Sequence, residues 1–201
     1  MKKHMAMLAA VLLMLCSFTA CGEDLATPEE MFETIKAAED LRVELKIRYD
    51  DGIQTSTTII EEDGDRSRVR METESFGAIA GDEYYTGVVD GKRYIYSQNT
   101  DGSWKKELLQ DWFTPASAEG LKVFFDSDLY YVEEGHYRMY KTGSTQLSGI
   151  VYNDVELEVM EDGSYCITAV ISESIDGLQV YGSATITISM GDVTVTLPKA
   201  E

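Results

Sequence analysis

The sequence predicts an α+β fold in which an amphipathic helix precedes an antiparallel β-sheet with a short central helix. Near residue 40 the apolar residues change from a helical period to strict alternation, which is typical of a half-buried strand. Asp-Gly dipeptides at residues 51, 63, 90, 101, 162 and 176 lie between strand-like runs, where they favour tight hairpin turns. Successive hairpins give an antiparallel meander, because parallel strands need long crossover connections.

The helix is predicted over residues 27–40. Thr27 is the expected N-cap, Pro28 suits the first helical position, and Glu30 completes a capping box. The apolar residues that recur on one face indicate that the helix packs against another element: Met31, Phe32, Ile35 and Ala38.

Two groups of strands flank a central segment. The first group is predicted over residues 41–49, 53–62, 66–75, 83–89, 92–98 and 104–109. The second is predicted over residues 129–132, 137–140, 155–160, 165–172, 178–190 and 193–197. The segment between them, 111–128, contains a proline, a glycine and several large apolar residues, and predicts a loop with a short helix that crosses a sheet face. No linker or repeat interrupts residues 27–201, which favours a single domain.

Residues 1–20 are typical of an export signal. Two lysines precede an apolar run, Met5–Cys16, that is too short to span a bilayer stably. Phe18-Thr19-Ala20-Cys21 resembles the lipobox of bacterial lipoproteins, and the resemblance implies that residues 1–20 are removed and that Cys21 carries the lipid. Residues 21–26 would then be a lipid-anchored tether. The alternatives are an ordinary secretory signal with a free Cys21 thiol, or an uncleaved signal anchor.

The export signal and the lipobox-like segment together predict a lipid-anchored protein on the extracytoplasmic face of the cell membrane. Without its first 20 residues the chain has 181 residues and a net charge of −21, since that segment holds two lysines and no acidic residue. Such a charge repels nucleic acid and anionic lipid headgroups, so we expect no nucleic-acid partner and a membrane contact that depends on the lipid. A Cys-Gly start on an acidic chain suits a Gram-positive surface.

No motif predicts catalysis, a metal or another cofactor, so we expect a protein that is not an enzyme. His136 is the one histidine beyond residue 20, and no G-x-S-x-G elbow accompanies it. Cys166 lies in a strand-like run and is expected to be a buried small hydrophobe. Asp63-Gly64-Asp65 and Asp126-Ser127-Asp128 carry oxygen ligands that suit Ca²⁺, but neither matches an EF-hand loop, and turn chemistry explains both.

Tyrosines are concentrated on strands that we expect to be neighbours. They have two interpretations: cross-strand packing, or a groove for an amphipathic ligand with phenol hydroxyls at its mouth. The residues that would line such a groove are Tyr85, Tyr94, Tyr96 and Tyr131.

The order of a helix, six strands, a helical excursion and further strands resembles the half-barrel lipoproteins of the LolA/LppX type, which are similar to outer-membrane lipoprotein carriers. The resemblance is carried by TPEEMFETIKAAEDLRVELKIRYDDG, VVDGKRYIYSQNTDGSWKK and GDVTVTLPKA. It implies that the sheet is a curved half-barrel wrapped on the two helices and encloses an apolar cavity. The function it implies is binding or chaperoning of a lipid or other apolar ligand. The alternative is a surface scaffold lipoprotein with a filled core and a protein partner.

Overall fold

The computed structural model describes residues 25–50, 52, 54–110, 115–140, 143–175 and 177–200. The expected signal peptide, Cys21 and most of the expected tether lie outside the described residues. The first described helix is α2 (Pro28–Ala37). It leads into the first group of strands: β1 (Asp40–Tyr49), β2 (Gln54–Asp63), β3 (Arg66–Ser75), β4 (Ala78–Val89), β5 (Lys92–Gln98) and β6 (Trp104–Leu108).

Two 3₁₀ segments, η1 (Ala118–Phe124) and η2 (Ser127–Leu129), occupy the central excursion. The second group of strands follows: β7 (Tyr130–Glu133), β8 (His136–Met139), β9 (Ser144–Leu147), β10 (Ile150–Val159), β11 (Tyr165–Ile175) and β12 (Leu178–Met190).

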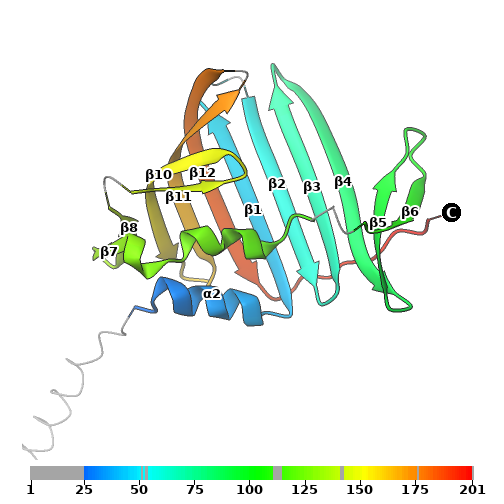
Figure 1. The fold of residues 1–201 in the computed structure, drawn as a ribbon, viewed down its shortest axis with the longest axis horizontal. Helices are drawn as coiled ribbons and strands as arrows, with labels where there is room; N and C mark the ends of the chain where they lie inside the picture. Colours follow the sequence, from blue (N-terminus) through cyan, green and yellow to red (C-terminus); the bar gives the residue numbers. More distant parts are fainter. Residues whose placement is uncertain are drawn as a thin grey trace, which may run out of the picture.

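All the strands of the described residues belong to one unclosed, curved sheet, which Figure 1 shows face-on. Its order is β6-β5-β4-β3-β2-β1-β12-β11-β10-β8-β7, with β9 paired to β10 off this path. Every pairing is antiparallel, and the first and last strands meet at the centre, with Val43 opposite Ile188. The prediction of an antiparallel, sheet-dominated fold is confirmed.

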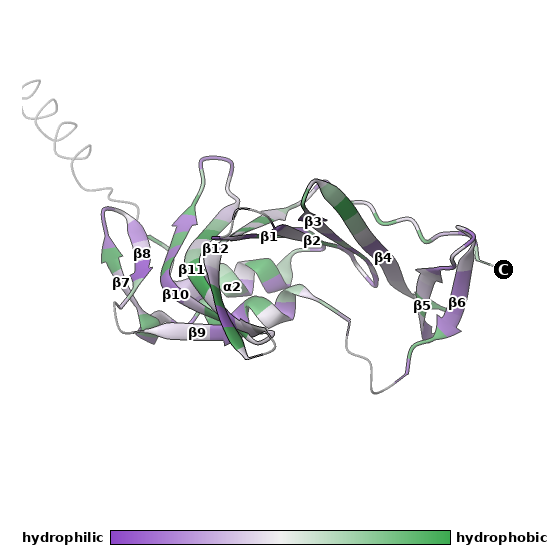
Figure 2. Cartoon of the chain, turned by 90° about the horizontal axis from the view of Figure 1, so that it is seen from above, coloured by the Kyte–Doolittle hydropathy of each residue, from purple (hydrophilic) through white to green (hydrophobic). Residues whose placement is uncertain are grey.

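The two faces of the sheet differ in chemistry. Alternation along β1 places Val43 and Ile47 on the concave face, where they are buried, and Arg42 and Glu44 on the opposite face. Figure 2 shows α2 and η1 lying within the curve of the sheet. The core lies there, and its most buried residues come from α2, η1 and the central strands: Met31, Ile35, Phe124, Leu157, Ile167, Ile186 and Ile188.

Local chemistry sets the position of α2. The Thr27 hydroxyl oxygen accepts a hydrogen bond from the backbone N–H of Glu30 at 3.3 Å, and the Thr27 N–H donates to Glu30 Oε2 at 2.8 Å. The apolar side of the helix, Met31, Phe32 and Ile35, is buried. Ala38 has extended backbone angles and caps the end of the helix, which is therefore shorter than predicted.

The predicted strand at 193–197 is wrong. Those residues form an extended tail that crosses the sheet on the face opposite the core. The Val195 N–H donates to Asp63 Oδ2 at 3.0 Å, its carbonyl accepts from Arg66, and Leu197 lies against Gly87. The alternating apolar residues are typical of a strand. The backbone of this tail, however, forms hydrogen bonds with side chains of β2 and β3 and does not pair with a neighbouring strand. Conversely, β9 was not predicted, because its short polar sequence has no apolar alternation.

Turn geometry follows the prediction only in part. Among the Asp-Gly pairs that are fully described, only Asp90-Gly91 has positive φ at both residues, 52° and 73°, as a type I′ turn requires. Phe76-Gly77 has the same geometry without an aspartate, with φ of 51° and 77°.

Candidate functional site

A groove of about 660 Å³ lies on the concave face, between the sheet and the central excursion. We call it the concave groove. Its floor is made by β1 and β2, one wall by residues 115–121, and the other wall by the β9–β10 hairpin. Its volume lies within the roughly 300–1,000 Å³ that is typical of small-molecule sites. The floor and end residues are Val43, Leu45, Ile47, Tyr49, Ser56, Thr58, Ile60 and Glu173.

The register of β1 with β2 determines the composition of the floor. Val43 lies opposite Ile60, and Leu45 lies opposite Thr58. Directly opposite residues share a face, so the floor is apolar along β1 and becomes hydroxyl-bearing along β2. A ligand on this floor would contact the half-buried Leu45 on one side and hydroxyls on the other, because Val43 and Ile47 are almost fully buried.

Two hydrogen bonds hold the 115–121 wall above the sheet. The Ala116 N–H donates to the Tyr84 hydroxyl oxygen, and the Ala118 N–H donates to Glu62 Oε1, each at 3.1 Å. Glu62 is on β2 and Tyr84 is on β4, and both side chains lie on the concave face, so the wall is attached to the sheet near the beginning of η1. On the far side, the Thr145 hydroxyl donates to the Val123 carbonyl at 3.1 Å and attaches β9 to η1.

The groove has a polar end. The Tyr49 hydroxyl donates to Glu173 Oε2 at 2.9 Å. Burial is the main cause that raises the pKa of Tyr49 to about 12, and this hydrogen bond is the second cause. Burial and the charge of Glu173 raise the pKa of Tyr152, whose side chain packs edge-on against Phe124, to about 12 as well. Both phenols therefore stay protonated at neutral pH, and Tyr49 remains a donor to the carboxylate.

A second cavity, of about 530 Å³, lies between α2 and η1. Phe32 and Phe125, whose rings stack at 5.5 Å, are among its lining residues. At its rim the Ser127 N–H donates to Glu29 Oε1 at 2.6 Å and attaches the start of η2 to α2. Its lining residues differ from those of the concave groove, so η1 separates two open spaces under the curved sheet.

The four predicted tyrosines lie elsewhere. Tyr85 and Tyr96 are cross-strand neighbours on the face opposite the core, where Tyr85 packs edge-on against Trp104 at 5.2 Å. Tyr94 lies beside them under the Lys106 ammonium, which is 4.0 Å from the centre of its ring. Tyr131 is on β7, in the other half of the sheet, beside Tyr140. The structure therefore brings three of the four together by cross-strand packing, and none of the four lines the concave groove.

Sequence reasoning missed Tyr49 and Glu173 as site residues, although part of the signal was present. Ile167, Ala169, Ile171 and Glu173 alternate along β11, so a carboxylate continues an apolar face. An acidic residue at such a position is a candidate functional group, because burying a carboxylate is unfavourable without a partner.

The other candidate residues have local partners. His136 begins β8, and its Nδ1 lies 3.5 Å from Glu158 and 3.7 Å from Glu156. Cys166 is half-buried, not buried as predicted, because it faces the polar side of the sheet; burial and the charges of Glu158 and Glu156 raise the pKa of its thiol. Asp126 caps η2 through the Asp128 N–H at 3.0 Å.

Within the described ranges, no group of three or more His, Cys, Asp or Glu side chains is arranged to hold a metal ion. In the same ranges, no helix has both the length and the apolar character needed to cross a membrane. No protein-family model matches the chain, and no curated protein matches it significantly.

Proposed function

We propose that this chain is a membrane-anchored, extracytoplasmic lipoprotein that binds or chaperones a lipid or another apolar ligand in the concave groove, without catalysing a reaction. In this proposal Cys21 carries the lipid. In the same proposal, the curved sheet with α2 and η1 inside it would be an α+β half-barrel of the LolA/LppX type.

The observation that carries the proposal is the concave groove itself. A space of about 660 Å³ remains between the apolar floor of β1 and the 115–121 wall. Small-molecule sites are typically apolar clefts of about this volume, so the groove favours a binding protein over a scaffold with a filled core.

The expected anchor fits the same function. About five residues separate Cys21 from the Thr27 cap, which allows a reach of roughly 17–20 Å if they are extended. A lipid on Cys21 would therefore hold the sheet close to the bilayer. An apolar ligand would then have only a short path between the groove and the membrane. Radioactive fatty-acid labelling that is lost on Cys21→Ser tests the anchor. Labelling that persists in this variant would contradict it.

The groove is tested by filling it. Thr58 faces the groove opposite Leu45, while its neighbour Thr57 faces the other side of the sheet opposite Lys46. Thr58→Trp should place an indole in the groove, and Thr57→Trp is the matched control on the same strand. The measurement is the fluorescence enhancement of Nile red, an uncharged apolar probe, with purified protein.

Wild type and Thr57→Trp should bind the probe with similar affinity, and Thr58→Trp should bind at least about tenfold more weakly, a loss of about 1.4 kcal/mol. Absence of saturable binding by the wild type, or equal binding by the two variants, would contradict the proposal. Native mass spectrometry of the wild type provides a second readout, because a bound lipid adds a defined mass.

A protein partner is the second candidate, and exposed apolar residues at the hairpin tips favour it. Phe76 is 84% exposed at the β3–β4 turn, and Leu178 is 72% exposed at the start of β12. Figure 1 shows both turns at the same end of the sheet. A photo-crosslinker at position 76 should join the chain to one defined membrane-proximal protein if this candidate is correct. The absence of any protein crosslink would contradict it.

A further inference from the structure

We infer that the occupant of the concave groove is a single-chain amphiphile with a protonated amino head group, which lies against Glu173 at the polar end of the groove. The inference rests on the proposed function and adds the chemistry of the ligand to it. It is carried by the charges and hydrogen-bonding directions of the residues that line the groove.

The charged residues that line the concave groove are all acidic. Glu173 lies at the polar end and Glu119 lies on the wall, and none of the described lining residues is Lys, Arg or His. Arg48, next to Tyr49 in β1, is on the opposite face, and Lys122 of η1 lines the second cavity. Arg66 and Arg93 line a separate cavity that shares residues 115–117 with the groove, and the acidic Glu62 and Asp65 line that cavity with them. The groove therefore has a negative potential that low-dielectric walls strengthen.

The hydrogen bond at the polar end leaves acceptors for a ligand. Tyr49 uses its only hydroxyl proton to bind Glu173 Oε2. Its oxygen lone pairs and Oε1 of Glu173 remain, and Oε1 has no hydrogen-bond partner among the described residues. A head group that enters this end therefore needs hydrogen-bond donors, which an ammonium group has and a carboxylate or phosphate lacks.

Two effects would disfavour the binding of an anionic head group at this position. It would lose its hydration without gaining a donor, and it would lie close to the Glu173 carboxylate. An alkylammonium would instead form a charge-assisted hydrogen bond, while its chain lies along the apolar floor of β1. The same groove therefore discriminates between amphiphiles that differ only in the head group.

The test uses three probes of equal chain length: dodecylamine, dodecanol and dodecanoate. Each displaces Nile red from the purified protein at pH 7.5, at a concentration below its micelle concentration or, for dodecanol, below its solubility limit. Dodecylamine should bind at least about tenfold more tightly than dodecanoate, with dodecanol between them.

Glu173→Gln should reduce the ratio of amine to carboxylate affinity to below about threefold, and Glu119→Gln, at an exposed position, should reduce it by a smaller factor. The matched control is Glu158→Gln on the opposite face, which should leave the ratio unchanged.

Tighter or equal binding of dodecanoate to the wild type would overturn the inference and leave the proposed function in place. An unchanged ratio in folded Glu173→Gln would also overturn it. If that variant fails to fold, an unchanged ratio in Glu119→Gln would overturn it. Failure of all three probes and of Nile red to bind would instead overturn the proposed function.

Discussion

Tyr49 and Glu173 form a 2.9 Å hydrogen bond between residues 124 positions apart in the sequence. Tyr49 is on β1 and Glu173 is on β11, with β12 between them. The residue of β12 opposite Tyr49 is Gly182, which has no side chain to obstruct the tyrosine. The polar end of the groove therefore depends on a glycine in the central pair of strands.

The first prediction concerns this glycine. A Cβ at Gly182 would collide with the carbonyl oxygen of Arg48 and lie 3.0 Å from the Cα of Tyr49, so β1 and β12 would have to separate. Gly182→Ala should lower the free energy of unfolding by about 1–3 kcal/mol, measured by urea denaturation. Gly120→Ala is the control, because its Cβ would meet only Leu147 Cδ1, at an ordinary 3.6 Å. Equal stability of the two variants would contradict the close packing at Gly182.

The second prediction removes the hydroxyl of Tyr49. Tyr49→Phe leaves the half-buried Glu173 carboxylate without its donor and should lower the free energy of unfolding by about 1 kcal/mol, since partial exposure limits the effect. Tyr181→Phe is the matched control, because this side chain is 55% exposed and makes no hydrogen bond with any described residue. Equal urea midpoints for both variants would show that the hydrogen bond contributes nothing to stability.

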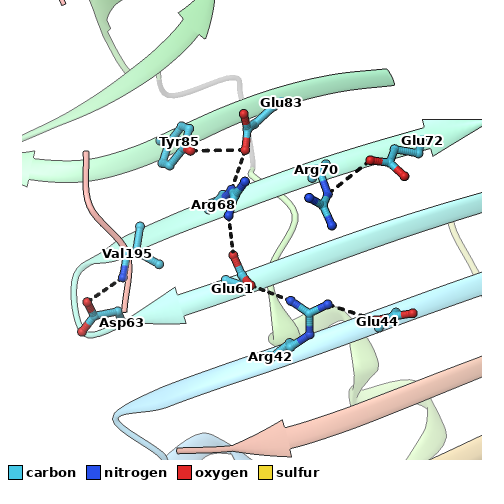
Figure 3. A network of polar contacts seen from close by, with 10 residues as sticks. All are labelled: Arg42, Glu44, Glu61, Asp63, Arg68, Arg70, Glu72, Glu83, Tyr85 and Val195. Carbon is cyan, nitrogen blue, oxygen red and sulfur yellow. Dashed lines mark hydrogen bonds and ion pairs between the residues drawn. The ribbon is translucent and has the colours of Figure 1, made fainter. Parts of the chain in front are cut away.

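The third prediction concerns the ion pairs on the face opposite the core, which Figure 3 shows. Glu61 lies between two arginines, at 2.6 Å from Arg42 and 3.3 Å from Arg68. Glu61→Gln should lower the free energy of unfolding by about 1 kcal/mol, and by less in 1 M salt, because screening weakens partly exposed pairs. Glu72→Gln is the control, since among the described residues Glu72 pairs only with the exposed Arg70, at 3.4 Å. A loss for Glu61→Gln that is independent of salt would contradict an electrostatic role.

The fourth prediction concerns pH and the capping box. The hydrogen bond that the Thr27 backbone donates to Glu30 lowers the pKa of that carboxyl from 4.5. A lowered folded-state pKa means that the ionised carboxylate stabilises the fold above about pH 4.5, and that this contribution is lost as the pH falls through the folded-state pKa. The stability difference between wild type and Glu30→Gln should therefore be constant near neutral pH and disappear in acid.

Thermal unfolding at a series of pH values measures this difference. Glu39→Gln is the control, because its exposed carboxylate makes no hydrogen bond with any described residue. A difference between wild type and Glu30→Gln that persisted at pH 2 would show that the carboxylate charge is not the cause.

Much of the sheet could be predicted because its signals are local. The alternation of Leu41, Val43 and Ile47 shows which side of β1 is buried, and Thr27 with Glu30 marks the start of α2. The tail at 193–197 was misread because the same alternation arises when one segment packs on a sheet without joining its ladder.

The groove could not be predicted in the same way. Which face of a sheet is concave depends on what packs against it, so the tyrosine-rich side of β4 and β5 could not be separated from the side that faces η1. The pairing of Tyr49 with Glu173 requires the register of β1 with β12. These are the first and last strands of the described residues, so they are far apart in the sequence. No local pattern contains that register.

The most direct test of the central claim, an apolar ligand in the concave groove, is a two-dimensional amide NMR titration of the protein with dodecanol. We predict saturable shift changes that are concentrated in residues 43–49, 56–60, 115–121 and 147–150, which line the groove. Changes concentrated at the Phe76 turn, or around Tyr85 and Trp104 on the opposite face, would contradict the claim, as would the absence of saturable changes.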